Sequence, residues 1–341
     1  MSLAVIFIIF LVVGIGFLVF FIFKKIIIPK RAEQSGNLAD RNETLKAIRA
    51  AKAVLEKDPQ NAEAHYLLGK AFLADKRDEQ AFREYKSANR LGIGGKNIPE
   101  TAFRETLAAL CTQFNEPEEA LKEYIALIKL FPENPEYYFR AGKIFGTRNR
   151  SDLAEQYIRK AVSINPRESR YRFELGMLYY LGKRLKEAGQ EFGAVLKLNP
   201  NDAQTLLYMG KVFKDAKDYD GAISYLEKAA RDQDYKLRAI NELGSCYISL
   251  KAFDKALPEL ERAVGLITKE ADPDSLYARY YLAMCYEMTD DIQKALAQWD
   301  KIYAQKKNFR DVGAKLTQYI EYRDQAAEKD PAAPQEPNKK A

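Results

Sequence analysis

The sequence has few of the residues that enzyme and metal sites most often use. Among 341 residues there is one histidine, His65. No CxxC pair, no HExxH motif and no group of carboxylates with histidine at ligand spacing is present in the sequence. We expect His65 to pack in the core rather than to act as a ligand or a base. The sequence therefore predicts no catalytic residue, no metal site and no cofactor, and indicates that the protein is not an enzyme.

Beyond residue 31 the chain also lacks a charge excess. Four basic residues lie in 24–31, and the remaining 310 residues carry 50 Lys and Arg against 48 Asp and Glu. The basic pI of about 8.9 thus reflects mainly one short segment. A nucleic-acid surface would need basic residues clustered on the folded domain, so we do not expect nucleic acid as a partner.

Cysteine is scarce and its spacing does not suit a disulfide framework. Cys111, Cys246 and Cys285 are far apart, odd in number and placed within apolar helical patterns. We expect them to behave as small buried hydrophobic residues in a reducing compartment. This agrees with a cytoplasmic location.

A long apolar run is present near the start of the chain. Residues 3–23 contain no polar side chain, and as a helix they would span about 31 Å, which matches the hydrocarbon core of a bilayer. A secretory signal would have a basic start, a shorter apolar run and a small-residue cleavage site, and none of these is seen. We therefore predict a transmembrane anchor with a basic flank at 1–31; the alternative is an export signal that is uncleaved or cleaved atypically.

The flank KKIIIPKR, residues 24–31, indicates the orientation of this anchor. Basic residues are enriched on the cytoplasmic side of membrane spans. We therefore predict a single-pass protein of the inner (cell) membrane whose remaining chain lies in the cytoplasm. Since large domains also cross membranes, a periplasmic location is the alternative.

A period of 34 residues runs through the rest of the chain. Each period has the pattern of two helices, the first with Gly and an aromatic residue three positions on, the second with Ala, a large residue and a small or aliphatic one at helical spacing. Small residues allow two helices to approach closely, and Pro ends the second helix. The residues that recur are Ala120, Ala154, Ala188, Ala222 and Ala256, then Gly142, Gly176, Gly210 and Gly244, then Pro132, Pro166 and Pro200.

These positions resemble the signature of the tetratricopeptide repeat (TPR) family, and the layout resembles a membrane-anchored bacterial TPR protein. The resemblance implies an all-α fold, a right-handed superhelical solenoid of about seven helix pairs, here with one N-terminal transmembrane helix. The array is expected at 62–309, with repeats at 62–95, 101–134, 135–168, 169–202, 203–236, 237–270 and 276–309.

The segments around the array are also assigned. Residues 32–61 are expected to hold a polar linker at 32–39 and a leading helix at 40–58. A capping helix is predicted at 310–330, because such arrays need a terminal unit with a polar outer face. The Pro-rich tail 331–341 is predicted to be disordered.

Two insertions interrupt the period, and we expect both to form longer surface loops. One surrounds GIGGK at 92–96 and the other ADPDS at 271–275. GIGGK lacks the spacing of a phosphate-binding loop and has no strand before it. It therefore predicts no nucleotide site.

The family resemblance implies a concave face that is lined by the first helix of each repeat and binds proteins or peptides. Aromatic and apolar residues at its fifth position and lysines at its ninth and twelfth would suit helical or extended segments with apolar and acidic residues. The alternative for the aromatics is packing between adjacent repeats. The predicted partner-binding residues are Tyr66, Lys70, Phe139, Lys143, Phe173, Met177, Tyr180, Leu207, Lys211 and Lys214.

The sequence thus predicts a non-enzymatic, membrane-tethered TPR scaffold that binds protein partners, including possible self-association, and supports assembly of a membrane-associated complex. One alternative is a structural subunit of a large envelope machine, such as a flagellar-motor collar, a pilus or a secretion system. The other is a regulatory adaptor that presents a membrane enzyme or a protease to its substrate. The sequence does not identify the partner.

Overall fold

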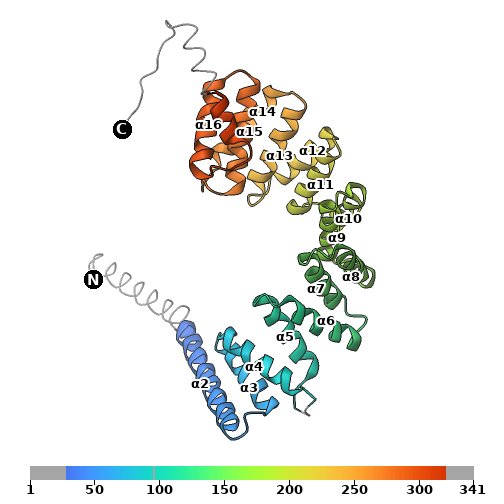
Figure 1. The fold of residues 1–341 in the computed structure, drawn as a ribbon, viewed down its shortest axis with the longest axis vertical. Coiled ribbons are helices and arrows are strands. Elements are labelled where there is room, and N and C mark those ends of the chain that lie inside the picture. The colour runs from blue at the N-terminus through green and yellow to red at the C-terminus, as the bar shows by residue number, and fades with distance from the viewer. Residues whose placement is uncertain (1–27, 95–96, 320–341) are drawn as a thin grey trace, which may run out of the picture. The chain divides into compact units, whose positions relative to one another are not determined.

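The computed structural model describes residues 28–94 and 97–319, and this part of the chain is helical, with no strand (Figure 1). The chain divides into an N-terminal unit, Met1–Ile144, and a C-terminal unit, Phe145–Ala341, which are described separately. The apolar run 3–23 and the tail 331–341 lie outside the described residues. No helix within the described ranges is long and apolar enough to cross a membrane.

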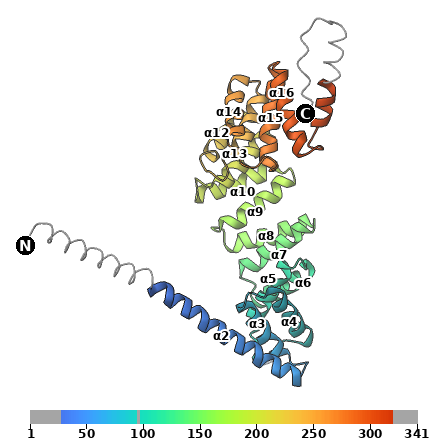
Figure 2. The same cartoon turned by 90° about the vertical axis from the view of Figure 1, so that its left-hand side faces the viewer.

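The N-terminal unit begins with one long helix, α2, which packs beside α3 (Figure 2). Two antiparallel pairs follow, α3 with α4 and α5 with α6. Helix α7, Pro135–Thr147, contains the division between the units. The bounds are α2 Ile28–Lys57, α3 Ala62–Ala74, α4 Asp78–Leu91, α5 Glu100–Gln113 and α6 Pro117–Leu130.

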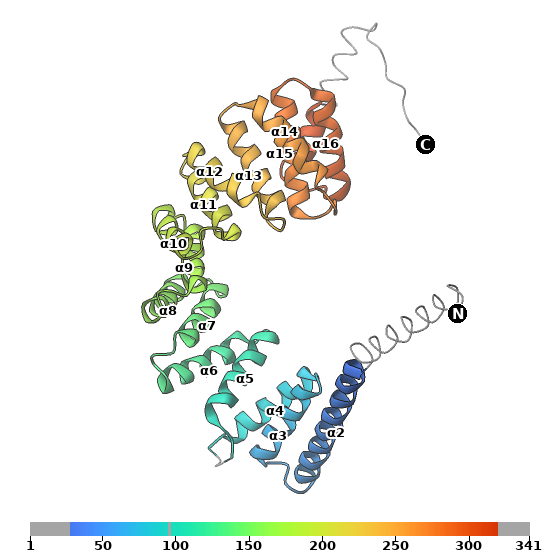
Figure 3. The same ribbon diagram turned by 180° about the vertical axis from the view of Figure 1, so that it is seen from behind.

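The C-terminal unit continues the alternation of first and second helices (Figure 3). The pairs α9 with α10, α11 with α12, α13 with α14 and α15 with α16 pack side by side. Residues 312–319 form the start of a further helix. The bounds are α8 Ser151–Ile164, α9 Ser169–Leu181, α10 Leu185–Leu198, α11 Ala203–Asp215, α12 Tyr219–Ala229, α13 Lys236–Ser249, α14 Phe253–Gly265, α15 Pro273–Met288 and α16 Ile292–Gln305.

Helix α2 begins earlier than the leading helix predicted at 40–58. Residues 32–39, expected to be a linker, are part of one helix of 30 residues. Pro29 is in its first turn, where proline is tolerated, and Gly36 costs only about 1 kcal/mol relative to Ala in a helix interior. No other breaker occurs before Lys57. Polarity alone therefore did not end the helix.

The packing face predicted for the second helices is confirmed. The recurring alanine is fully buried in all seven second helices, and the large residue four positions on and the residue three further are also buried. Alanine thus lies where the two helices cross, with the larger side chains beside it. The alanines are Ala81, Ala120, Ala154, Ala188, Ala222, Ala256 and Ala295.

In several pairs a glycine on the first helix faces the large buried residue of the second helix. A Cβ atom built on Gly210 would lie 2.5 Å from Cγ of Leu226, and one on Gly244 would lie 2.3 Å from Cδ2 of Leu260. Both leucines are fully buried, so neither can easily move aside. The close approach of the two helices therefore requires glycine in these pairs, whereas Ala108 and Ala283 show that the second and seventh pairs accommodate a methyl group.

The turn inside each pair closes in the same way every time. The second residue after the first helix has a left-handed backbone, and backbone N–H groups bond back to the last helical carbonyls, as Asp218 N does to Phe213 O at 2.9 Å. This geometry satisfies carbonyls that a helix end leaves unpaired. The left-handed residues are Lys76, Asn115, Asn149, Lys183, Lys217, Lys251 and Asp290.

The two predicted insertions form the connections α4 to α5 and α14 to α15. The second one ends earlier than expected, because Pro273 already starts α15. This connection is held by Glu270, whose Oε1 and Oε2 accept from Nη2 and Nε of Arg279 at 2.6 and 2.8 Å. Arg279 is buried, and the ion pair fastens the connection to α15.

The predicted cap is described as far as residue 319. Phe309 and Val312 are buried against α15 and α16, and Leu316 packs on the same cluster, which includes Trp299. These contacts cover the apolar face that the last pair would otherwise expose.

The three cysteines are buried and the single histidine is half-buried. Cys111, Cys246 and Cys285 are free thiols and buried, as predicted. Burial raises their pKa values to about 12, about 12 and about 11, which keeps the thiols protonated and unreactive. His65 is half-buried rather than in the core: its Nδ1 lies 2.5 Å from Glu84 Oε2 and its Nε2 lies 3.1 Å from the carbonyl of Pro59.

We expect Gly210→Ala to lower the free energy of unfolding by about 1–3 kcal/mol, because the added methyl group overpacks the contact with Leu226. Gly265→Ala is the matched control: it is also helical, but no atom lies within 4 Å of its Cβ position. The control should be neutral or stabilising by up to about 1 kcal/mol. Urea unfolding followed by circular dichroism measures both, and equal effects would contradict the close-approach account.

Candidate functional site

The first helices of the C-terminal unit present a continuous set of partly exposed aromatic and charged side chains. They come from α9, α11, α13 and α15, which succeed one another along the unit. We call this set the first-helix surface. Its members are Phe173, Met177, Tyr180, Tyr208, Lys211, Lys214, Arg238, Glu242, Tyr277 and Tyr281, all of them half-buried or exposed.

Tyr208 is the centre of the aromatic part. Its ring centroid lies 5.7 Å from that of Phe173 and 5.9 Å from that of Tyr180, both with edge-to-face geometry. The three rings are half-buried, so each supports the others while leaving apolar area accessible. This part of the surface can contact an apolar side chain of a partner.

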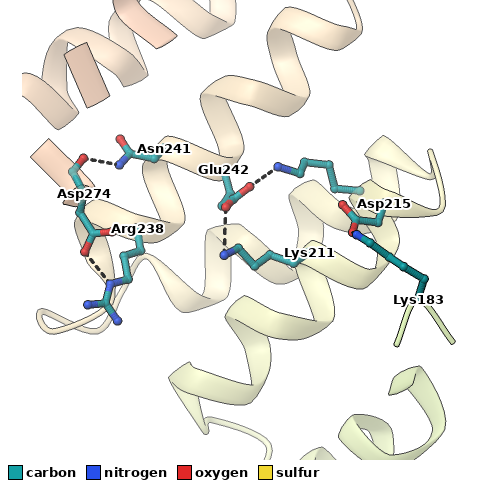
Figure 4. A network of polar contacts seen from close by, with 8 residues as sticks. Lys183, Lys211, Asp215, Arg238, Asn241, Glu242 and Asp274 are labelled. Atoms are coloured by element: carbon teal, nitrogen blue, oxygen red, sulfur yellow. Dashed lines mark hydrogen bonds and ion pairs between the residues drawn. The ribbon is translucent and has the colours of Figure 1, made fainter. Parts of the chain in front are cut away.

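The carboxylate of Glu242 is shared by two lysines of α11 (Figure 4). Glu242 of α13 accepts from Lys211 Nζ at 3.2 Å and also pairs with Lys214, both on α11. Burial would lower the pKa of the Lys214 ammonium, but the Glu242 carboxylate outweighs this effect and raises the pKa above its usual value. Two ammonium groups thus share one carboxylate, which leaves an excess of one positive charge.

Three further polar contacts link successive repeats (Figure 4). Arg238 Nε donates to Asp274 Oδ2 at 2.6 Å, and Asn241 Nδ2 donates to the backbone carbonyl of Asp274 at 2.8 Å. Lys183 Nζ lies 3.2 Å from Asp215 Oδ2. These contacts fix α13 against α15 and anchor the turn after α9 to α11.

Tyr180 joins the aromatic and the charged parts. Burial, together with the nearby carboxylates of Asp215 and Glu242, raises the pKa of its hydroxyl. The hydroxyl is therefore neutral across the physiological range and can donate a hydrogen bond.

The structure corrects three of the predicted partner-binding residues. Tyr66, Phe139 and Leu207 are only 4%, 4% and 2% exposed. Tyr66 packs between repeats, with its ring 5.9 Å from that of Phe103 on the next first helix. The contact of Tyr66 is the packing between repeats given as the alternative, whereas Phe173, at the same position of its own repeat, is only half-buried.

The other predicted residues remain accessible, although in different surroundings. In the N-terminal unit Lys70 and Lys143 are exposed, with each ammonium over an aromatic ring, at 5.6 Å from Tyr66 and 5.8 Å from Phe139. In the C-terminal unit Phe173, Met177, Tyr180, Lys211 and Lys214 are half-buried and lie on the first-helix surface.

Two important members were missed from the sequence. Tyr208 lies directly after the fifth position of its repeat, and Glu242 pairs with lysines of the preceding repeat. The sequence carries no signal for this pairing, because it depends on contacts between two repeats. Within the described residues, no group of three or more His, Cys, Asp or Glu side chains could hold a metal ion.

The chain matches one protein family. The profile of the tetratricopeptide repeat family matches residues 37–95, 113–168, 147–203 and 207–275, more than half of the chain. No curated protein matches the chain.

Solved structures share the architecture at low identity. A tetratricopeptide repeat protein from Parabacteroides merdae is similar with a TM-score of 0.56 and 14% identity, covering 76% of this chain and 98% of its own. In the Cut9–Hcn1 structure the similar chain has a TM-score of 0.52 and 16% identity, covering 81% of this chain and 52% of its own. YrrB, described as a TPR protein with an unusual peptide-binding site, gives a TM-score of 0.46 and 20% identity, covering 57% of this chain and 97% of its own.

We expect Glu242→Gln to lower the free energy of unfolding by about 1–3 kcal/mol, because two partly buried ammonium groups lose their shared carboxylate. Glu259→Gln removes a more exposed carboxylate, paired with Arg262 within α14, and should cost less than about 0.5 kcal/mol. Urea titration compares the two variants. A loss of the same size in both would show that the shared carboxylate has no special role.

Proposed function

Because the chain belongs to the tetratricopeptide repeat family, we propose that it is a membrane-tethered scaffold that holds a protein partner on its first-helix surface. Members of this family are typically non-enzymatic, and the matched repeats account for most of the folded chain. The observation that carries the proposal is the accessible group of Phe173, Tyr180 and Tyr208 next to the excess positive charge of Lys211 and Lys214.

This surface favours a segment that carries both apolar and acidic residues. The three half-buried rings supply apolar area, which contributes most of the free energy of association. The lysines supply orientation and attract an acidic segment from a distance, an effect that salt weakens. The partner is accordingly a helical or extended protein segment.

The tether is proposed from the sequence of residues 3–23 and the basic flank that follows. An anchored scaffold keeps its partner near the bilayer and so raises the effective concentration for a second encounter there. Helix α2 begins at Ile28, within this flank, and would carry the array away from the membrane. The orientation we propose is cytoplasmic, because the basic residues follow the run.

We expect a photo-crosslinking residue at Met177 or at Tyr277 to capture a protein in cells. The matched controls are Lys186 and Lys197, which are exposed on the second helix α10 and should capture none. Mass spectrometry of the adducts identifies the partner. Adducts from the α10 positions alone would contradict the proposed surface.

The same adducts separate the alternative functions. A second copy of this chain, or a component of one large envelope assembly, would favour a structural subunit. A membrane enzyme or a protease would favour the regulatory adaptor.

We expect the full chain to resist alkaline extraction from membranes, and a C-terminal alkaline phosphatase fusion to be inactive because it stays in the cytoplasm. Val12→Arg together with Ile15→Arg should release the protein, because each arginine opposes insertion by about 2.5–3.5 kcal/mol. An active phosphatase fusion would reverse the proposed orientation, and release of the unaltered chain would exclude the tether.

A further inference from the structure

A small cavity lies where the first-helix surface meets the cap. It has a volume of about 250 Å³, enough for one side chain of a partner. Its walls come from α11, α13 and α15 and from the turn after α16. The residues that matter to its chemistry are Arg238, Asn241, Asp274, Tyr277, Tyr281 and Arg310.

The charges that line this cavity do not balance. Its acidic residues are Glu242 and Asp274, and its basic residues are Lys211, Arg238 and Arg310. Glu242 is bound to lysine and Asp274 to Arg238. Arg310 forms no ion pair within residues 28–94 and 97–319. The lining thus carries one net positive charge, located on Arg310.

The guanidinium of Arg310 rests on aromatic rings. It lies 4.6 Å from the ring centroid of Tyr280 and 5.7 Å from that of Tyr277. Stacking uses the flat face of a guanidinium and leaves the N–H groups at its edge free to bind a carboxylate through two hydrogen bonds.

The backbone holds Arg310 in this position. Phe309 is buried, with its ring 5.2 Å from that of Tyr277. Asp311 Oδ1 accepts a hydrogen bond from the Tyr280 hydroxyl at 2.8 Å, which ties this turn to α15. Arg310 itself has a φ of 48°, a left-handed conformation that its two fixed neighbours maintain. A side chain fixed in advance loses little entropy on binding.

Two further side chains in the cavity wall, those of Tyr277 and Asn241, bear on how a peptide could bind. Tyr277 is 37% exposed, and its ring stacks with that of Tyr281 at 6.1 Å, which gives the cavity an apolar wall. Asn241 is 4% exposed, and its Oδ1 is buried with no hydrogen-bond partner within the described chain. An unpaired buried acceptor is unfavourable, and a rotation of the Asn241 side chain would be needed to present it to a peptide N–H group.

We propose that this cavity binds the carboxylate of an aspartate or glutamate in the partner segment, with Arg310 as the anchor. The proposal rests on the proposed function, since it names one residue of the segment held on the first-helix surface. A single negative charge matches the single unpaired cation. A phosphate group carries nearly two negative charges, more than the one net positive charge of the cavity lining.

The test uses the full chain in detergent micelles and a display library of random peptides. Binders that contain one Asp or Glu are synthesised with blocked ends, together with versions in which that residue is Asn or Gln. Affinities are measured by fluorescence anisotropy on the unaltered chain, on Arg310→Gln and on Arg310→Lys. Arg231→Gln is the matched control, because it removes the same charge from an exposed residue in the turn after α12, away from the cavity.

We expect Arg310→Gln to weaken the acidic peptides by about tenfold to a hundredfold, as for the loss of a charge-assisted hydrogen bond, and to leave the amide versions unchanged. Arg310→Lys should have a smaller effect, and Arg231→Gln should have almost none. Equal binding of the acidic peptides to the unaltered chain and to Arg310→Gln would overturn the anchor while peptide binding itself stands. If no peptide bound the unaltered chain, the proposed function would fail and the anchor with it.

Discussion

The close crossing of two helices within each repeat is the contact on which the rest of this structure depends. In every described pair a fully buried alanine of the second helix lies at the crossing, and in several pairs a glycine of the first helix faces a large residue such as Leu226 or Leu260. Once a pair is formed in this way, its outer faces are apolar and must be covered by the next pair. The cap around Phe309 and Val312 covers the last of them.

This packing also decides which side chains are left for a partner. The fifth-position aromatic of the first helix is buried in some repeats, as Tyr66 is against Phe103, and half-buried in others, as Phe173 is. Accessible area remains at Phe173, at Tyr208 in the neighbouring position, and near the end of the helix, where Lys211 and Lys214 lie. Ion pairs such as those of Glu242 then reduce the free charge on this surface and connect adjacent first helices.

Several elements were predictable from the sequence because they depend on local chemistry repeated at a fixed spacing. The alanine positions were predicted and are buried, and the buried thiols followed from their place in apolar patterns. The prediction of a polar linker at 32–39 was wrong, because these residues belong to helix α2. A polar segment can extend a helix whose later turns are held by packing, and here α2 packs on α3. The pairing of Lys214 with Glu242 could not be predicted, since it depends on how far two successive helices are rotated against each other.

The sequence by itself determined the family, the helix pairs and the residues at their crossings, because a period of 34 residues places the same side chains at the same contact each time. Only the tertiary structure decided which aromatics pack and which are accessible, and which cations have partners. The reason is physical: burial and ion pairing depend on neighbours from other repeats and from the cap. Arg310 is an example, since nothing in its local sequence shows that it is stacked on Tyr280 and has no ion pair among the described residues.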